Sequence, residues 1–478
     1  MVRATSLQWW CDVDPGVVRC AVAGLADIDL DLHRYRAAGS RSWCIVDAAG
    51  VPVLEAFHAL NVCYRSPYLA SLYLIESCDH GASWQPVAAA HLSSAKPYRT
   101  FLNDLGRTCA QLLRAGLRTA TTIQDHRPSW LAAPPTPAHS YPLLRAAIVS
   151  LAAWLKARLG GDLYGIALLD RTAESFLRNE VVAVAEWSEI PARHGFIADP
   201  FFWPGRPGHM LCEIYSHATG LGRVAAMPVG PAALTDVEDV SLPVSGHLSY
   251  PFAWAENGRV YCLPEMAASR RQVLFEILPG QAPVEVCVVA ENIGMADPTL
   301  MRMGELYWLA YSDMDIDPYN NLCLMHASDL TGPWQAHPGN PVKIDARSSR
   351  PGGTPFQVGD KVYRPAQDCS ASYGGALVIN QVMVCNTEDY AEEAIAVLTP
   401  DPVGRFPDGL HTLSFGDGSV LIDGKRVSYH PAILLHKLRR RLMSMIAGGE
   451  PNFVSSPGCQ TLPDSSGWVD PITGTPSQ

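Results

Sequence analysis

Four short segments with a common pattern recur at nearly regular intervals in the second half of the chain. In each segment a polar residue immediately precedes a proline. The prolines lie 51, 47 and 53 residues apart, in Asp199-Pro200, Tyr250-Pro251, Asp297-Pro298 and Arg350-Pro351. An apolar run led by a glycine follows each segment, at Gly208, Gly258, Gly304 and Gly359. A period of about 50 residues with several short strands per unit is typical of a β-propeller.

The same repeat predicts where polar side chains meet. In a propeller the innermost strand of each blade starts near the central axis, so the residue before each proline should face one shared pocket. Two aspartates, a tyrosine and an arginine would then meet there. We therefore expect a polar pocket suited to a sugar-like ligand.

Composition and periodicity divide the chain into five expected segments. They are a small α/β region over 1–127, a Pro-rich linker and helix over 128–160, a five-bladed β-propeller over 161–430, a basic amphipathic helix over 431–447 and a disordered tail over 448–478. The fifth blade begins near Leu410 without a proline, and a strand near residues 163–169 would complete it. The expected fold class is mainly β.

Charge and cysteine usage limit the partners. The net charge of −11, without a dense basic stripe in the main body, argues against nucleic acid. The 13 cysteines lack a Cys-x-x-Cys pair, which favours buried thiols in a reducing compartment over zinc. The start of the chain lacks a signal-peptide pattern, so we expect a cytoplasmic protein. The helix over 431–447 either packs on its own domain or makes a peripheral membrane contact through its basic face.

No cofactor and no metal site are expected from the sequence. The run Asp313, Asp315 and Asp317 offers alternate carboxylates, but Pro318 follows where a calcium loop would need its glycine. A solvated loop between two strands is the interpretation we favour for this run.

Several spaced motifs carry a family resemblance. They are Phe196-Ile-Ala-Asp-Pro-Phe, His247-Leu-Ser-Tyr-Pro-Phe, Leu263-Pro-Glu265, Ala296-Asp-Pro-Thr and Tyr363-Arg-Pro-Ala-Gln-Asp368. In this order they resemble the N-terminal domain of glucosamine inositolphosphorylceramide transferases, over about residues 165–425. In the plant proteins a separate glycosyltransferase domain follows, for which the residues after 430 are too few. Residues 1–125 resemble a shortened formyltransferase-like region without its catalytic set.

More remotely, the repeat is similar to the five-bladed propellers of glycoside hydrolase family 43. That resemblance implies catalytic roles for Asp199 and Asp297, which hold the inner-strand starts of blades one and three. The family's general acid is a glutamate at the start of blade four, where this chain has Arg350. We therefore favour Glu265 as the acid, with Glu213 as a spare carboxyl.

Glycoside cleavage needs one carboxyl that protonates the leaving oxygen and a second that activates water or attacks the sugar. We expect Asp199, Asp297 and Glu265 to form this catalytic set. Arg350 either neutralises the aspartates or holds a phosphate or carboxylate of the ligand, assisted by Arg364 and Lys343. The expected substrate-binding residues are Arg350, Tyr250, His247, Arg364, Gln367, Asp368, His411 and Glu213.

These residues predict a carbohydrate-active enzyme that transfers or cleaves a glycosyl group on an anionic, phosphate-bearing glycoconjugate or sugar donor. Its partner would be a carbohydrate or nucleotide-sugar substrate. The alternative is a non-catalytic carbohydrate-binding module that serves a separate glycosyltransferase. The missing glutamate of blade four favours the binding module, whereas the retained aspartates favour the enzyme.

Overall fold

A computed structural model describes residues 17–20, 28–31, 42–47, 69–77, 85–94, 96, 98–118, several positions between 148 and 159, and then 160–230, 237–416 and 418–446. The predicted tail over 448–478 and most of the predicted linker lie outside these residues. The described part is dominated by strands, which confirms the mainly β fold class.

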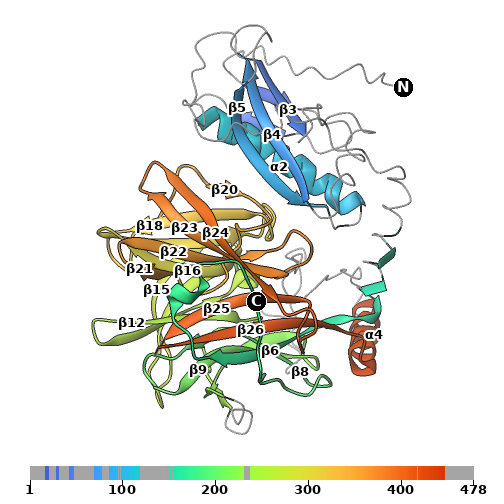
Figure 1. Cartoon of the computed structure of the whole chain (residues 1–478), viewed down its shortest axis with the longest axis vertical. Coiled ribbons are helices and arrows are strands. Elements are labelled where there is room, and N and C mark those ends of the chain that lie inside the picture. The colour runs from blue at the N-terminus through green and yellow to red at the C-terminus, as the bar shows by residue number, and fades with distance from the viewer. Residues whose placement is uncertain are drawn as a thin grey trace.

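Five sheets follow one another along the main body (Figure 1). Sheet one contains β8 (Gly195–Phe202), β9 (His209–Ser216), β10 (Leu221–Pro228) and β11 (Glu238–Asp239). Sheet two contains β12 (Ser249–Glu256), β13 (Arg259–Glu265), β14 (Arg271–Glu276) and β15 (Val284–Glu291). Sheet three contains β16 (Met295–Met303), β17 (Leu306–Asp313), β18 (Asn321–Ala327), β19 (Gln335–Ala336) and β20 (Lys343–Ile344).

The last two sheets recruit strands from before sheet one. Sheet four contains β21 (Phe356–Val358), β22 (Lys361–Asp368), β23 (Ala376–Cys385), β24 (Tyr390–Pro400) and, parallel to β24, β7 (Glu180–Val182). Sheet five contains β25 (Gly409–Gly416), β26 (Ser419–Ser428) and β6 (Gly161–Leu169). The strand predicted near residues 163–169 corresponds to β6, which pairs antiparallel with β26.

Strands near the middle of this assembly are buried on both faces. In β13 the residues from Val260 to Glu265 are all buried, as are those from Gly195 to Phe201 in β8. A strand covered on both faces shows a continuous apolar run instead of alternation. This explains the unbroken apolar segments that follow each glycine of the sequence repeat.

The inner strands share a backbone irregularity at the repeated motif. Register shifts lie between Ala198 and Phe201 in β8, Ser249 and Phe252 in β12, Ala296 and Thr299 in β16, and Leu410 and Leu413 in β25. Bulges of this kind redirect a side chain within a strand. The residue before the proline has a positive φ in three of the four motifs, 52° at Asp199, 45° at Tyr250 and 49° at Asp297, but not at Arg350. Such angles are costly for residues other than glycine and persist where surrounding contacts enforce them.

The N-terminal residues form a separate α/β layer. The strands β3 (Ser42–Asp47), β4 (Leu69–Ser77) and β5 (Gln85–Ser93) pair in order, and α2 (Tyr98–Arg118) packs on them through Phe101, Leu105 and Leu112. A short hairpin of β1 (Val17–Cys20) and β2 (Ile28–Asp31) precedes them. This layer contacts sheet three beside β20, where the N–H of Ala346 donates to the carbonyl of His91 at 2.8 Å (Figure 1).

The helix α4 (Pro431–Ile446) packs beside β6. Ile433 is buried with Leu163 and Tyr164, whereas Leu435 and Leu438 are exposed. Among the described residues, no helix combines the length and the apolar character needed to cross a membrane.

Candidate active site

A cavity lies where the inner strands converge. Its lining consists of Tyr164, Phe196, Ala198, Asp199, Glu213, His247, Ser249, Glu265, Asp297, Arg350, Tyr373 and His411. Seven of the eleven residues predicted for the site are therefore on its wall. Four carboxyl groups line it, together with one guanidinium and two imidazoles.

Asp199 is held by sheets two and five. Its Oδ2 accepts the backbone N–H of Tyr250 at 3.2 Å, and its Oδ1 accepts the hydroxyl of Thr412 at 2.8 Å. Burial raises the pKa of Asp199 to about 6, and the neighbouring His411 opposes that rise. The carboxyl thus titrates near neutral pH, which suits a group that accepts a proton during a reaction.

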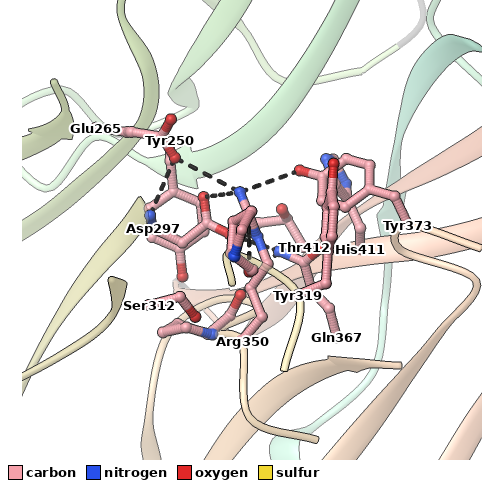
Figure 2. Close-up of polar contacts among 12 residues, drawn as sticks. Tyr250, Glu265, Asp297, Ser312, Tyr319, Arg350, Gln367, Tyr373, His411 and Thr412 are labelled. Carbon is pink, nitrogen blue, oxygen red and sulfur yellow. Dashed lines mark hydrogen bonds and ion pairs between the residues drawn. The ribbon is translucent and has the colours of Figure 1, made fainter. Parts of the chain in front are cut away.

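Asp297 pairs with Arg350 on the wall of the cavity (Figure 2). Arg350 donates Nε to Oδ2 at 2.6 Å and Nη2 to Oδ1 at 3.2 Å, and its Nη1 donates to the carbonyl of Pro318 at 3.2 Å. Gln367 also donates to Oδ2 at 2.6 Å. Burial raises the pKa of Asp297 to about 7 and the guanidinium opposes that rise. Of the two roles that the sequence left open for Arg350, neutralising the aspartates or holding an anion of the ligand, the observed contact is with Asp297.

Glu265 connects this pair to sheet two. Its Oε2 accepts the backbone N–H of Asp297 at 3.0 Å and lies 3.6 Å from Nη2 of Arg350. Only the Asp297 N–H donates a hydrogen bond to this oxygen, and the guanidinium of Arg350 lies beside it as an opposite charge. Glu265, the carboxyl predicted to be the acid, therefore holds the backbone of Asp297 in sheet three.

Glu213 and His247 form a second acidic corner. Nε2 of His247 lies 3.7 Å from Oε1 of Glu213, and no hydrogen bond reaches that oxygen. Burial raises the pKa of Glu213 well above its usual range, and the carboxylates of Asp199 and Glu265 raise it further. Burial lowers the pKa of His247 to about 4. The raised pKa of Glu213 and the lowered pKa of His247 both favour the uncharged form of each group.

His411 lies between two carboxylates. Its Nδ1 is 2.6 Å from Oδ2 of Asp423, and its Nε2 is 3.4 Å from Oδ1 of Asp199. Burial acts to lower the pKa of His411, but Asp423 and Asp199 together raise it. The sequence analysis missed Asp423, which lies on β26 and has no repeat signature of its own.

The ligand atoms of Asp199, His411 and Asp423 lie within 4.8 Å of one another, close enough to surround a metal ion. However, Oδ2 of Asp423 accepts the N–H of Asp199, and Oδ1 accepts the N–H groups of His411 and Thr412. Backbone N–H groups thus orient both oxygens of Asp423, whereas no hydrogen bond reaches the buried Nδ1 of His411.

Two tyrosines form aromatic walls that the sequence analysis did not single out. Tyr164 stacks on His411 with ring centroids 4.7 Å apart, and its buried hydroxyl has no hydrogen-bond partner. Tyr373 meets His411 edge-on and lies under the guanidinium of Arg350, 4.9 Å from its ring centroid (Figure 2). Aromatic faces beside carboxyl groups are typical of sugar-binding cavities.

Four predicted site residues lie outside the cavity wall. The hydroxyl of Tyr250 contacts Thr299 at 2.8 Å and accepts the N–H of Gly353 at 2.7 Å, so its ring packs between sheets (Figure 2). Gln367 supports Asp297 from behind. Asp368 accepts the N–H of Ser370 at 2.8 Å. Arg364 and Lys343 both bind Glu392, at 2.6 and 2.8 Å, in a buried ion-pair group of their own.

Comparison with known proteins finds a family match over most of the strand-rich segment. Residues 167–403 match the family model described as glucosamine inositolphosphorylceramide transferase 1, N-terminal. The protein of that name from Arabidopsis thaliana is 26% identical, covering 54% of this chain and 36% of the relative. The one from Oryza sativa subsp. indica is 27% identical, covering 45% and 30%. The chain therefore spans about a third of the length of these curated relatives.

Solved structures similar to this chain are glycoside hydrolases. They include a family 117 glycoside hydrolase of Zobellia galactanivorans, with 12% identity and a TM-score of 0.34, covering 57% of this chain and 92% of that one. A family 32 β-fructofuranosidase of Bombyx mori has 14% identity and a TM-score of 0.34, covering 49% and 56%. A GH43_1 enzyme of Xanthomonas citri has 14% identity and a TM-score of 0.31, covering 50% and 89%. At these scores the likeness assigns no residue and no reaction.

The matched segment ends before β25, so His411 and Asp423 lie beyond it. The resemblance predicted from the spaced motifs is nevertheless confirmed, since residues 167–403 match the model of the glucosamine inositolphosphorylceramide transferase 1 N-terminal family.

Proposed function

We propose that this protein is a carbohydrate-active enzyme that transfers or cleaves a glycosyl group, with the cavity as its active site. The observation that carries the proposal is the convergence of four buried carboxyls from three sheets beside two tyrosine rings: Asp199, Glu213, Glu265 and Asp297 with Tyr164 and Tyr373. Paired carboxyls with differently perturbed pKa values are what acid and base catalysis at a sugar requires.

We further propose that the five sheets close into a five-bladed propeller around this cavity. Contacts between consecutive sheets support the ring. Asp423 of sheet five binds the N–H of Asp199, Asp199 binds that of Tyr250, and Glu265 of sheet two binds that of Asp297. Gln367 of sheet four donates to Asp297, and Gly353 bridges to Leu413 of sheet five. Each motif residue is thereby held by its neighbouring sheet.

The charge of the cavity constrains the substrate. Arg350 is committed to Asp297, and Arg364 and Lys343 are committed to Glu392. The remaining carboxyls favour a neutral or amine-bearing sugar ring in the cavity, with any phosphate of the glycoconjugate outside it. The names of the curated relatives include glucosamine, which is an amine-bearing sugar of this kind.

In this scheme Asp199 accepts a proton from the attacking hydroxyl group, and Asp297 with Arg350 fixes the wall of the cavity. The second candidate function is a carbohydrate-binding module that presents its ligand to a separate transferase. The Arg350–Asp297 pair favours this candidate, because it occupies the position of the acid in the family 43 enzymes and withdraws one of the two motif aspartates from chemistry.

The experiment is a turnover and binding screen of the full chain with nitrophenyl glycosides, including glucosaminides, and with nucleotide sugars. Asp199→Asn should lower kcat by about 100-fold or more on any productive substrate, because it removes the proton acceptor. Glu291→Gln, an exposed carboxyl change, is the matched control and should leave kcat unaltered. Calorimetric binding that survives Asp199→Asn, with no product from any substrate, would establish the binding module instead.

A further inference from the structure

One carboxyl of the cavity is free of the contacts that occupy the others. Asp199 accepts from Tyr250 and Thr412, Asp297 accepts from Arg350, and Glu265 accepts from the backbone of Asp297. Among the cavity residues that the structure describes, only Glu213 has a buried carboxyl oxygen, Oε1, without a hydrogen-bond partner. Its other oxygen, Oε2, accepts no hydrogen bond from the described residues either and lines the cavity, and a group that donates a proton to a ligand needs an oxygen left open in this way.

The surroundings of Glu213 hold no cation that would keep it ionised at neutral pH. Nδ1 of His247 accepts the N–H of Gly222 at 2.8 Å, so the proton of the neutral ring lies on Nε2, toward Glu213. The other groups that act on Glu213 are carboxyls from four strands, Asp199 of β8, Glu265 of β13, Asp297 of β16 and Asp423 of β26. Tyr164 of β6 presents its unpartnered hydroxyl to the same cavity.

The backbone is shaped to seat this side chain. Gly222 on β10 lies against it, and a Cβ atom there would be 2.0 Å from Oε1 of Glu213 and 2.7 Å from the carbonyl of Leu248. The absence of a side chain at residue 222 is therefore what leaves room for the Glu213 carboxyl. The backbone of this strand thus accommodates the Glu213 carboxyl, which is buried and is not a solvated strand end.

We infer that Glu213, positioned by His247, is the proton donor of this active site, in place of the Glu265 favoured by the motif pattern. This inference rests on the proposed function. In hydrolysis Glu213 gives its proton to the glycosidic oxygen as the bond from C1 to that oxygen breaks, and the bonding pair stays on the oxygen. The leaving group departs as an alcohol.

The second half of the step balances the first. A water oxygen bonds to C1 while Asp199 takes one of its protons, so Glu213 ends ionised and Asp199 ends protonated. Exchange of one proton with solvent restores both carboxyls. In transfer, the hydroxyl of an acceptor replaces the water.

Leaving-group dependence tests the assignment. Aryl glycosides of the sugar turned over by the wild type are compared with a 2,4-dinitrophenyl and a phenyl leaving group. Glu213→Gln should lose about 100- to 10,000-fold on the phenyl glycoside but little on the dinitrophenyl one, whose leaving group needs no proton. The alkaline limb of its pH profile should also disappear. Glu265→Gln, an isosteric change in the same cavity, should affect both substrates alike. Leaving-group dependence in Glu265→Gln, or equal losses in Glu213→Gln, would overturn the assignment.

A readout without substrate separates this inference from the proposed function. The infrared difference spectrum of wild type minus Glu213→Gln at pH 7 should contain the C=O band of a protonated carboxyl. His247→Gln should shift the pH at which the band disappears. If the first spectrum lacks the band, Glu213 is ionised and cannot be the donor, whatever the turnover screen shows.

Discussion

Arg350 and Asp297 form a bidentate ion pair, with Nε and Oδ2 2.6 Å apart, in which the side chains are 1% and 4% exposed. The pair joins the motif of sheet three to the segment that precedes sheet four. Each charge is removed from water and compensated mainly by the other. The pair therefore has a structural role in the wall of the cavity.

Arg350→Met should lower the free energy of unfolding by about 3–5 kcal/mol, because Asp297 is left as an uncompensated buried charge. The measurement is urea-induced unfolding followed by circular dichroism. Arg302→Met, which removes an exposed pair with Glu256, should cost at most about 1 kcal/mol. The double variant Arg350→Met with Asp297→Asn should recover most of the loss. A loss below about 1 kcal/mol in Arg350→Met would contradict the role assigned to the pair.

His247 should make stability depend on pH in the acidic range. Its pKa is lowered from 6.5 to about 4 by burial, so the unfolded chain takes up a proton before the folded one as pH falls. The stability held by neutral His247 is complete above pH 6.5 and is lost as pH falls toward 4, at up to about 1.4 kcal/mol per pH unit. His247→Gln should therefore flatten the decline in this window, measured by urea unfolding at several pH values. The exposed His194→Gln is the control, and an equal flattening there would contradict the prediction.

The repeat was sufficient to predict which residues meet, because strand starts converge whatever the detailed register. Asp199, Asp297 and Arg350 all reach the cavity for this reason. The orientation of each side chain was not predictable, since it depends on the bulge beside each proline. Tyr250 has the motif backbone, yet its ring turns toward Thr299 and away from the cavity.

Interaction partners that lie outside the repeat could not be predicted from the sequence either. Glu392 neutralises Arg364 from β24, and Tyr164 reaches the cavity from β6, which precedes the first repeat. Neither has a motif that marks it. The choice between Glu213 and Glu265 required their hydrogen-bond partners, because both stand at the end of a second strand in the sequence.

Gly222→Ala should displace the carboxyl of Glu213. A methyl group would overlap Oε1 and the carbonyl of Leu248, so the side chain and the strand must both move. We expect a loss of stability of about 1–3 kcal/mol, within the usual range for overpacking, and a loss of the protonated-carboxyl infrared band. Gly205→Ala, where the new atom meets a flexible Val260 side chain at 3.2 Å, is the control. Retention of the band in Gly222→Ala would show that Glu213 is not seated by this contact.

Lys96 should couple the N-terminal layer to the cavity. Its Nζ donates to Asp104 of α2 at 2.6 Å and to Asp317, in the loop after β17, at 3.2 Å. The same loop accepts from Arg350 at the Pro318 carbonyl and packs Tyr319 against Tyr373 of the cavity wall, 5.6 Å between ring centroids (Figure 2). A change at Lys96 should therefore affect the cavity through Asp317, Pro318 and Tyr319.

Lys96→Met should cost about 1–3 kcal/mol, because two largely buried carboxylates lose their shared cation. Hydrogen exchange should accelerate at the Ala346 amide, which bonds the carbonyl of His91 between the two layers. Replacing Asp317 as well, in Lys96→Met with Asp317→Asn, removes one unpaired charge and should restore part of the protection. Unaltered exchange at Ala346 in Lys96→Met, with stability preserved, would mean that the layers are held by the apolar contact of Ile344 with the N-terminal core and not by this ion pair.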